Sequence, residues 1–295
     1  MEIVNEHVMD NNIWEEENMK VKYLKKTVLV SVIMIVGLST ILAGCGAKKD
    51  NSVQSIQNKK ELVVGTSADF APYDFQIMKN GKQQIVGYDV LLAHEIAKDM
   101  GVKKVIFVNM AFPSLINELQ NKKVDIVMAG MAYTPQRAKV VSFSESYHDG
   151  GQVLLVSPKN KDKYANIAAL KGATLGAQQS SEQEKIGKKL KGVKLVTESS
   201  NNTLTQELQN GSIDGLITGE DTAEVYAKEH PDKYAVVNNI SFKYNKKESA
   251  TRVAVRKNDK ALLKKINATI SKDKKNGTLD KLYKQAQDIQ VANNK

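Results

Sequence analysis

Cysteine and arginine are scarce in this sequence. Cys45 is the only cysteine among 295 residues, so the chain cannot form an internal disulfide. The sequence also lacks a nucleophile elbow, a phosphate-binding loop and a cluster of Cys and His residues. The segment from His94 to Lys98 begins like a zinc-binding helix, but Lys98 stands where the second histidine is needed. We therefore expect no metal site and no cofactor.

Arginine accounts for only three of the 43 basic residues, Arg137, Arg252 and Arg256. The net charge of +10 comes from lysines, which are scattered along the chain with no basic run interleaved with aromatic residues. This pattern indicates a solvated surface and no nucleic-acid partner. It also suits a protein held near an anionic membrane. With 41% apolar and 26% charged residues, the chain has the composition and length of two globular domains.

The N-terminal region has the pattern of a secretory signal. Lysines at positions 20, 22, 25 and 26 precede about 15 apolar residues that end in Leu42-Ala43-Gly44-Cys45. This last stretch resembles the bacterial lipobox, which implies that Cys45 carries a lipid and anchors the chain to the extracytoplasmic face of the cell membrane. The alternative is an uncleaved membrane anchor.

The residues on either side of the apolar run have no pattern of a fold. Residues 1–18 are acidic and unlike the start of a signal peptide, so we interpret residues 1–44 as a mis-called start followed by a signal peptide. Residues 45–60 are polar and rich in Ser, Asn and Gln, which predicts a flexible tether.

From residue 61 onward, short apolar runs alternate with helical patterns. Strands are expected at 61–67, 104–110 and 124–130, with helices at 87–101 and 112–123 between them. The alternation returns as strands at 172–178, 193–199 and 213–219, with helices at 180–192 and 202–212. This order predicts βαβ units and largely parallel sheets.

One unit of sequence occurs twice. Residues 115–130 and 204–219 both read Leu-x-x-Glu-Leu-Gln-Asn-x-x-(Val/Ile)-Asp followed by an apolar strand that ends in Gly. Because no third copy exists, we predict two similar α/β lobes with mixed, mostly parallel sheets. Two extended crossings, 151–158 and 251–257, would join the lobes and leave a ligand cleft between them. Lobe 1 is expected to comprise 61–153 and 251–290, and lobe 2 to comprise 154–250.

Four loops are expected to face one another across this cleft, because ligands of open α/β sheets bind at the carboxyl ends of the strands. The loops are 67–73, 129–137, 177–181 and 218–221.

Arg137 is the most informative residue of these loops. Thr134 and Pro135 before it resemble the N-cap and first position of a helix. A guanidinium matches a carboxylate through two parallel hydrogen bonds, which an ammonium cannot do. Backbone N–H groups around Gly130 and Met131 could share the same anion. The alternative is a structural arginine paired with a carboxylate such as Glu145.

Asp69, Phe70 and Tyr73 in the first loop, together with Phe112, complete a site for a small zwitterion. Aromatic rings would contact the apolar part of the ligand, and a carboxylate would hold its ammonium. The alternative for the aromatic residues is core packing.

Residues 61–287 resemble the polar amino-acid-binding proteins of ABC importers, which have the type II periplasmic-binding-protein fold. The residues that carry the resemblance include "LVVGTSADFAPYDF" and, most specifically, "AFPSLINELQNKKVDIVMAGMAYTPQRAKVVSFSESYH". The resemblance implies a monomeric receptor that delivers an amino acid to ABC permease subunits. It also implies that Arg137 holds the ligand carboxylate, in the loop formed by Ala129, Gly130, Met131 and Ala132. Phe70 and Phe112 would be walls, and Gln178 and Ser181 would close the site from the second lobe.

The chain departs from the family pattern at three positions. Many relatives have Ser or Thr where this chain has Ala132. The acid that often binds the α-ammonium falls on Gly219, with Glu220 one residue later, and Ser67 stands where some relatives have Asp. The ammonium partner is therefore Glu220 or Asp69, or else the ligand is not a standard α-amino acid.

Two other functions fit the same fold. An enzyme similar to cyclohexadienyl dehydratase would use Asp69 or Glu220 as a general acid, but no second catalytic group stands out. A sensor domain would need a C-terminal membrane span and a signalling module, which the sequence lacks.

Overall fold

The computed structural model describes residues 50–240, 242–245 and 249–293, which belong to one compact unit, Asp50–Lys295. The predicted signal peptide, Cys45 and residues 45–49 of the predicted tether lie outside the described residues. Within the described part, no helix is long and apolar enough to span a membrane.

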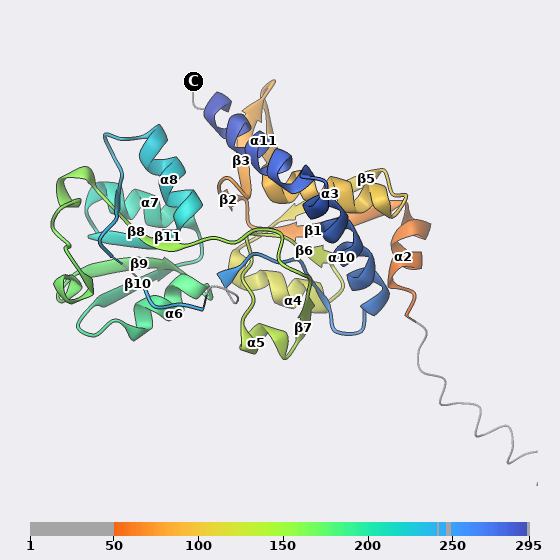
Figure 1. Cartoon of the computed structure of the whole chain (residues 1–295), viewed down its shortest axis with the longest axis horizontal. Coiled ribbons are helices and arrows are strands. Elements are labelled where there is room, and N and C mark those ends of the chain that lie inside the picture. The colour runs from red at the N-terminus through yellow and green to blue at the C-terminus, as the bar shows by residue number, and fades with distance from the viewer. Residues whose placement is uncertain (1–49, 241, 246–248, 294–295) are drawn as a thin grey trace, which may run out of the picture. The chain divides into compact units, whose positions relative to one another are not determined.

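The first lobe is built on a five-stranded sheet of order β5-β1-β6-β13-β7 (Figure 1). Strand β1 (Glu61–Thr66) pairs in parallel with β5 (Lys104–Asn109) and β6 (Ile126–Val127). Strand β13 (Ala254–Arg256) runs antiparallel to β6 and to β7 (Val141–Phe143).

Both faces of this sheet are covered by helices. Helices α3 (Tyr88–Asp99), α10 (Lys260–Lys275) and α11 (Thr278–Asn293) share one apolar cluster with Leu62 and Val64. The helical segment η2 (Phe112–Ser114) and α4 (Leu115–Gln120) share a second cluster with Val127 and Val141. The side chains of β1 alternate between the two clusters, which is the pattern of a strand buried on both faces.

The second lobe has a sheet of the same design, of order β10-β9-β11-β8-β12. Strands β9 (Thr174–Gln178), β10 (Lys194–Glu198) and β11 (Gly215–Gly219) are parallel. Strand β8 (Gln152–Val156) runs antiparallel to β11, and β12 (Ala235–Val237) runs antiparallel to β8. Helix α6 (Glu182–Lys189) packs on one face, and α7 (Asn201–Asn210) and α8 (Glu220–Glu229) pack on the other.

The repeated sequence unit occupies equivalent places in the two sheets. Its first copy is α4 followed by β6, and its second copy is α7 followed by β11. Each of these strands lies third in its sheet and borders the antiparallel pair of strands. The predicted architecture of two similar α/β lobes is confirmed.

Two extended segments connect the lobes, as Figure 1 shows in green and blue. They touch at His148 and Thr251, which form an isolated antiparallel bridge. Gln152 and Val153, which we placed in lobe 1, already pair with Gly219 and Thr218 of the second sheet. The first crossing is therefore shorter than predicted.

Residues 52–59 form a helix where we predicted part of the tether. Helix α2 (Ser52–Lys59) buries Ile56, which is 1% exposed, in the first lobe's core. Asp50 accepts hydrogen bonds from Ser52 N (3.0 Å) and from Ala261 N at the start of α10 (2.6 Å). The prediction of a flexible tether is thus wrong for residues 50–59, because one buried isoleucine and a capping aspartate fix this polar segment.

A small sheet was also missed. Strand β2 (Asp69–Phe70) pairs with β3 (Asp74–Lys79), which forms a hairpin with β4 (Lys82–Val86). The turn Asn80-Gly81 has positive φ at both residues, 52° and 71°, as a two-residue hairpin turn requires.

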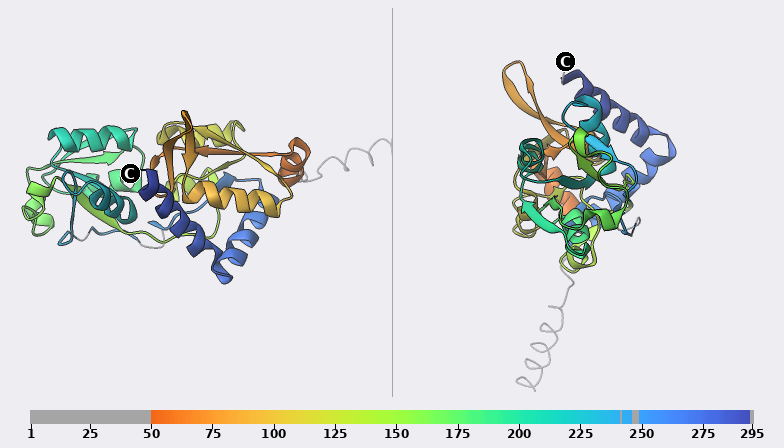
Figure 2. Two further views of the ribbon diagram at one scale, coloured as in Figure 1. Left: turned by 90° about the horizontal axis from the view of Figure 1, so that it is seen from above. Right: turned by 90° about the vertical axis from the view of Figure 1, so that its left-hand side faces the viewer.

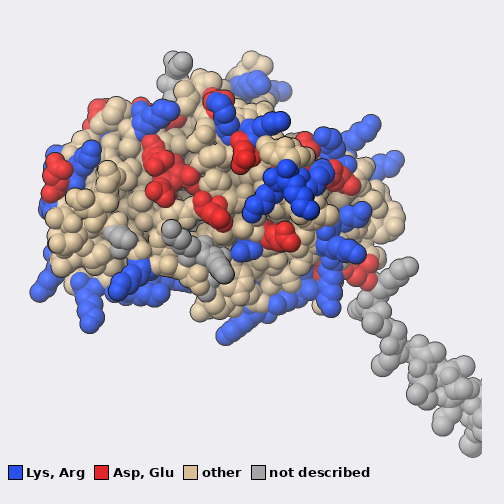
Figure 3. All heavy atoms as spheres, viewed as in Figure 1, with Lys and Arg blue, Asp and Glu red and all other residues tan. Residues whose placement is uncertain are grey.

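Three short helical segments complete the described elements: α5 (Pro135–Ala138), η3 (Pro158–Asn160) and η4 (Ile167–Leu170). On the face drawn in Figure 3, Lys and Arg are spread out and mixed with Asp and Glu. This distribution agrees with the scatter of lysines along the sequence.

Candidate functional site

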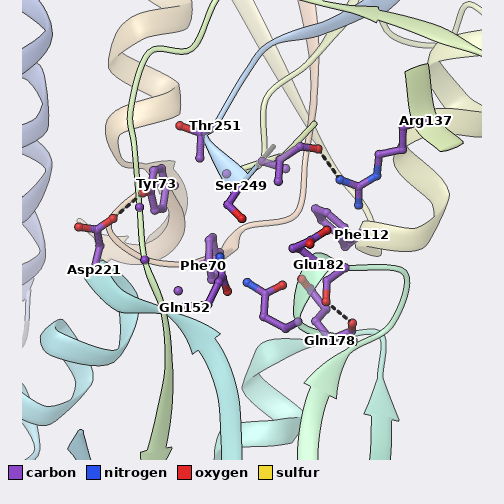
Figure 4. Close-up of a pocket in the computed structure, with 18 residues that line it drawn as sticks. Phe70, Tyr73, Phe112, Arg137, Gln152, Gln178, Glu182, Asp221, Ser249 and Thr251 are labelled. Atoms are coloured by element: carbon purple, nitrogen blue, oxygen red, sulfur yellow. Dashed lines mark hydrogen bonds between the residues drawn. The ribbon is translucent and has the colours of Figure 1, made fainter. Parts of the chain in front are cut away.

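A pocket lies between the two lobes, next to the segments that connect them (Figure 4). All four predicted loops contribute to it. The predicted residues that line it are Phe70, Tyr73, Phe112, Ala129, Gly130, Ala132, Arg137, Gln178, Ser181 and Gly219. Three other predicted residues, Asp69, Met131 and Glu220, do not line it.

Arg137 lies at one end of the pocket and contacts both lobes. Thr134 caps α5 by accepting a hydrogen bond from the Arg137 N–H (3.1 Å), as the sequence predicted. The side chain donates from Nη1 to the Ala132 carbonyl (2.7 Å) and from Nη2 to the Ser180 carbonyl of the second lobe (2.8 Å). Glu145, the alternative partner of Arg137, is not among the acceptors of its guanidinium. The Glu145 backbone N–H donates to Asn267 Oδ1.

The electrostatic surroundings of Arg137 favour an anionic partner. Burial lowers its pKa to about 10, and the nearby Glu182 carboxylate opposes this shift. The Phe112 ring lies under the guanidinium, 5.1 Å from its centroid to Cζ. A guanidinium has five N–H donors, and two are used on the carbonyl groups. A carboxylate at this end would relieve the cost of burying the charge.

Phe70 and Tyr73 form the opposite wall. Their rings are stacked at 5.4 Å between centroids. Glycines flank Phe70 closely: a Cβ at Gly130 would lie 2.6 Å from its ring, which is too close, and a Cβ at Gly219 would make a tight contact of 3.1 Å with it. Gly130 also has φ +54°, which favours glycine.

The backbone around Gly130 does not present its N–H to the pocket. The Gly130 N–H donates to Asp89 Oδ2 (2.7 Å), and Met131 is fully buried in the core. The expectation that these two N–H groups share the ligand's anion with Arg137 is therefore wrong for Gly130. Burial raises the pKa of Asp89 to about 6, although the hydrogen bonds from Gly130 and Tyr147 oppose this shift.

Asp69 holds the lobes together outside the pocket. Its Oδ2 accepts hydrogen bonds from Ser200 Oγ (2.8 Å) and from the Asn201 N–H at the start of α7 (2.9 Å). Burial raises its pKa in spite of these bonds. Asp69 thus caps a helix of the other lobe.

The acids at the start of α8 point in different directions. Glu220 packs against Gly151, where a Cβ would lie 2.0 Å from its Oε2, and it lines a neighbouring groove. Asp221 lines the pocket at the end away from Arg137 (Figure 4). Asp221 therefore stands where we expected Glu220, one residue later in the sequence.

Asp221 is already well supplied with donors. It accepts hydrogen bonds from Tyr73 Oη (2.6 Å) and Tyr283 Oη (2.7 Å), and His148 Nε2 lies 3.1 Å away. Although burial acts to raise the pKa of Asp221, the hydrogen bonds from His148 and Tyr73 keep it below its usual value. The Asp221 carboxylate thus links the second lobe to three parts of the first lobe's side: Tyr73 in a loop, His148 on a connecting segment and Tyr283 on α11.

The second lobe contributes the N-terminus of α6. Ser181 caps this helix by accepting a hydrogen bond from the Glu184 N–H (3.1 Å), and its own hydroxyl donates to the Gln178 carbonyl (2.6 Å). Gln178 donates from Nε2 to the Ser199 carbonyl (3.2 Å). A helix N-terminus and amide side chains thus face Arg137 across the pocket.

The sequence matches the family described as bacterial extracellular solute-binding proteins, family 3, over residues 62–287. The chain belongs to this family. It is 34% identical over 264 residues to the arginine-binding extracellular protein ArtP of Bacillus subtilis, with 88% of this chain and 97% of ArtP covered.

Solved structures agree with this assignment. An amino acid ABC transporter substrate-binding protein, AbpA, from Streptococcus pneumoniae, bound to L-arginine, is 32% identical with a TM-score of 0.77, covering 81% of this chain and 99% of that one. The ancestral amino acid-binding protein AncCDT-1, a precursor of cyclohexadienyl dehydratase, is 35% identical with a TM-score of 0.71, covering 79% and 98%. The similar proteins are binding proteins, and this solute-binding protein is not an enzyme.

Sequence reasoning missed the part of the site that comes from the crossing segments. On or beside the connecting segments, the pocket is also lined by Gly150, Gly151, Gln152, Ser249 and Thr251. Glu182 and Gln183 at the start of α6 and Asp221 at the start of α8 line it as well. The pair Gly150-Gly151 beside a predicted crossing was a usable signal, since glycine permits close approach of other chain segments. No group of three or more His, Cys, Asp or Glu suited to a metal occurs among the described residues.

Proposed function

We propose that this chain is the extracytoplasmic receptor of an amino-acid ABC importer, and that it binds a polar amino acid between its lobes and delivers it to the permease. L-Arginine is the first candidate, because ArtP and AbpA, to which the chain is similar, are an arginine-binding protein and a protein solved with L-arginine. A lipid on Cys45 would hold the receptor at the membrane and permit delivery to a neighbouring permease.

The observation that carries this proposal is the position of Arg137. Its half-buried guanidinium lies at one end of an interlobe pocket, over Phe112, with donors left for a carboxylate. Phe70 and Tyr73 supply apolar walls, and amide and hydroxyl groups supply polar contacts. A ligand enclosed between the lobes becomes part of their interface, so that binding biases a hinge equilibrium toward closure.

A thermal-shift screen tests the proposal. The twenty common amino acids are added singly to residues 50–295 at concentrations up to about 100 times a micromolar Kd. The correct ligand should add about 2.7 kcal/mol of stability, because it binds the folded state alone. Prephenate and arogenate serve as negative controls, since they suit the rejected enzymatic alternative. The absence of a shift with every amino acid would refute the proposal.

A further inference from the structure

Among the residues that the structure describes, the pocket has no free carboxylate for the ammonium group of an amino acid. Asp221 accepts from Tyr73 and Tyr283 and contacts His148, while Asp69 is bonded to the second lobe outside the pocket. Glu220 lines the neighbouring groove. An ammonium ion enclosed here needs acceptors from another source, because a buried charge without hydrogen bonds is costly.

Glu182, the remaining acid of the lining, belongs to the carboxylate end. Its charge acts on Arg137, and its Oε2 lies 3.6 Å from Lys185 Nζ. It therefore balances the guanidinium that receives the ligand carboxylate. The α-ammonium of the same ligand is a cation, so it needs acceptors that do not already face a cation such as Arg137.

Two uncharged side chains from the crossing segments have acceptors to offer. Gln152 is 8% exposed and Ser249 is 4% exposed, and both line the pocket. Within the described residues, Gln152 Oε1 and Ser249 Oγ are buried without a hydrogen-bond partner. A buried acceptor without a hydrogen bond destabilises the fold, so a ligand that donates to these two atoms recovers this cost.

The strand register places these acceptors beside the wall that holds Phe70. Gln152 is the direct cross-strand partner of Gly219 in the β8–β11 pair, and Gly219 packs against Phe70. Directly opposed residues of antiparallel strands have neighbouring side chains, and glycine leaves that space to its partner. Figure 4 shows Ser249 and Gln152 toward Phe70, with Arg137 across the pocket.

We propose that Gln152 Oε1 and Ser249 Oγ receive the α-ammonium of the bound amino acid, so that uncharged hinge residues replace a carboxylate. The inference rests on the proposed function and adds the residues that select α-amino acids over carboxylic acids without an amino group. The two acceptors come from different connections between the lobes, since Gln152 begins β8 of the second lobe and Ser249 lies on the returning segment.

Paired ligands test this inference. L-Arginine is compared with 5-guanidinopentanoate, and L-glutamine with glutaramate, each pair differing only in the α-ammonium. Isothermal titration gives the ratio of affinities for the wild-type protein and for Gln152→Leu and Ser249→Ala. Each variant should lose about 10-fold or more in affinity for the amino acid, and little for the analogue, because each removes a hydrogen bond to a charged group that the analogue lacks. Gln152→Glu should increase the ratio.

Gln179→Leu is the matched control, because Gln179 is an exposed glutamine of the same lobe that does not line the pocket. If the wild type binds an amino acid but the ratio is unchanged in Ser249→Ala and Gln152→Leu, the inference is overturned and the proposed function stands. If a variant lost the same fold of affinity for the amino acid and for its analogue, the inference would be overturned too. If the wild type binds neither amino acid, the proposed function fails first. Ser249→Ala keeps the test valid should Gln152→Leu not fold.

Discussion

At the scale of single residues, the backbone of Arg137 is held by Thr134, close to it in sequence, whereas the acids of the site are held by residues from distant parts of the chain. Arg137 could be placed because its loop follows a strand and its helix cap is local in sequence. The roles of Asp69, Glu220 and Asp221 could not be assigned, because their hydrogen-bond partners are as distant in sequence as Ser200 and Tyr73. Adjacent acids at a helix start point to different cavities, and only tertiary structure decides which.

Asp89 leads to a prediction about pH. Its pKa is raised from 3.8 to about 6 by burial, so the folded protein binds more protons than the unfolded chain between these pH values. Stability should therefore fall as pH rises from about 4 to about 6, by an amount on the order of 2 kcal/mol from this residue. In Asp89→Asn this decrease should be smaller by that amount.

Urea denaturation at half-unit pH steps measures the effect. Asp162→Asn, at an exposed aspartate, is the control and should follow the wild-type profile. An Asp89→Asn profile parallel to the wild type from pH 4 to 6 would show that Asp89 is ionised normally.

At the scale of secondary-structure elements, the sequence predicted the alternating strands and helices well. Apolar runs and helical periodicity are local, and the repeated unit of α4 and β6 is visible again in α7 and β11. The β3–β4 hairpin was missed although Asn80-Gly81 is a hairpin signal. Helix α2 was missed because it buries few apolar side chains and owes its position to contacts with α10, more than 200 residues away.

Helix α2 should contribute measurably to stability. Ile56→Ala removes a side chain that is 1% exposed and should cost about 2–5 kcal/mol, as for other large-to-small core substitutions. Gln54→Ala on the exposed face of the same helix should change stability little. Equilibrium unfolding in urea compares the two. Equal stability of Ile56→Ala and wild type would mean that residues 52–59 are a tether after all.

Helix α11 connects the first lobe to the second. It packs against α3 and α10, while Tyr283 donates to Asp221 (2.7 Å) and Gln290 Nε2 donates to Glu229 Oε2 (3.1 Å). Figures 1 and 2 show its C-terminal end, in dark blue, reaching toward the second lobe. Opening the lobes would break these contacts.

Tyr283→Phe should therefore weaken the closed arrangement without touching the carboxylate end of the pocket. It removes one hydrogen bond to a charged group, worth about 1.5–3 kcal/mol, so the ligand's dissociation rate should rise on the order of 10-fold. Stopped-flow displacement of L-arginine measures this rate. Lys284→Ala, which removes an exposed pair with Asp288 on the same helix, is the control. Identical rates in Tyr283→Phe and Lys284→Ala would exclude this role for α11.

At the scale of the whole molecule, the two sheets share one design, and the site is formed where they meet. Arg137 bonds to Ser180, Asp69 to Asn201 and Tyr73 to Asp221, so that each contact joins one lobe to the other. A ligand that held Arg137 and the hinge acceptors together would add its own contacts to this interface. Closure and binding are then one equilibrium, which a solute receptor requires.

Titration calorimetry with Arg137→Ala tests this account most directly. The wild-type protein, Arg137→Ala and the control Lys139→Ala, which removes an exposed charge from the same segment, are titrated with L-arginine and with any other amino acid that the screen identifies. Wild type and Lys139→Ala should bind with similar affinity, and Arg137→Ala should lose about 2 kcal/mol or more, roughly 30-fold, because the ligand carboxylate loses its charged partner. Equal affinity in Arg137→Ala and wild type would contradict the account.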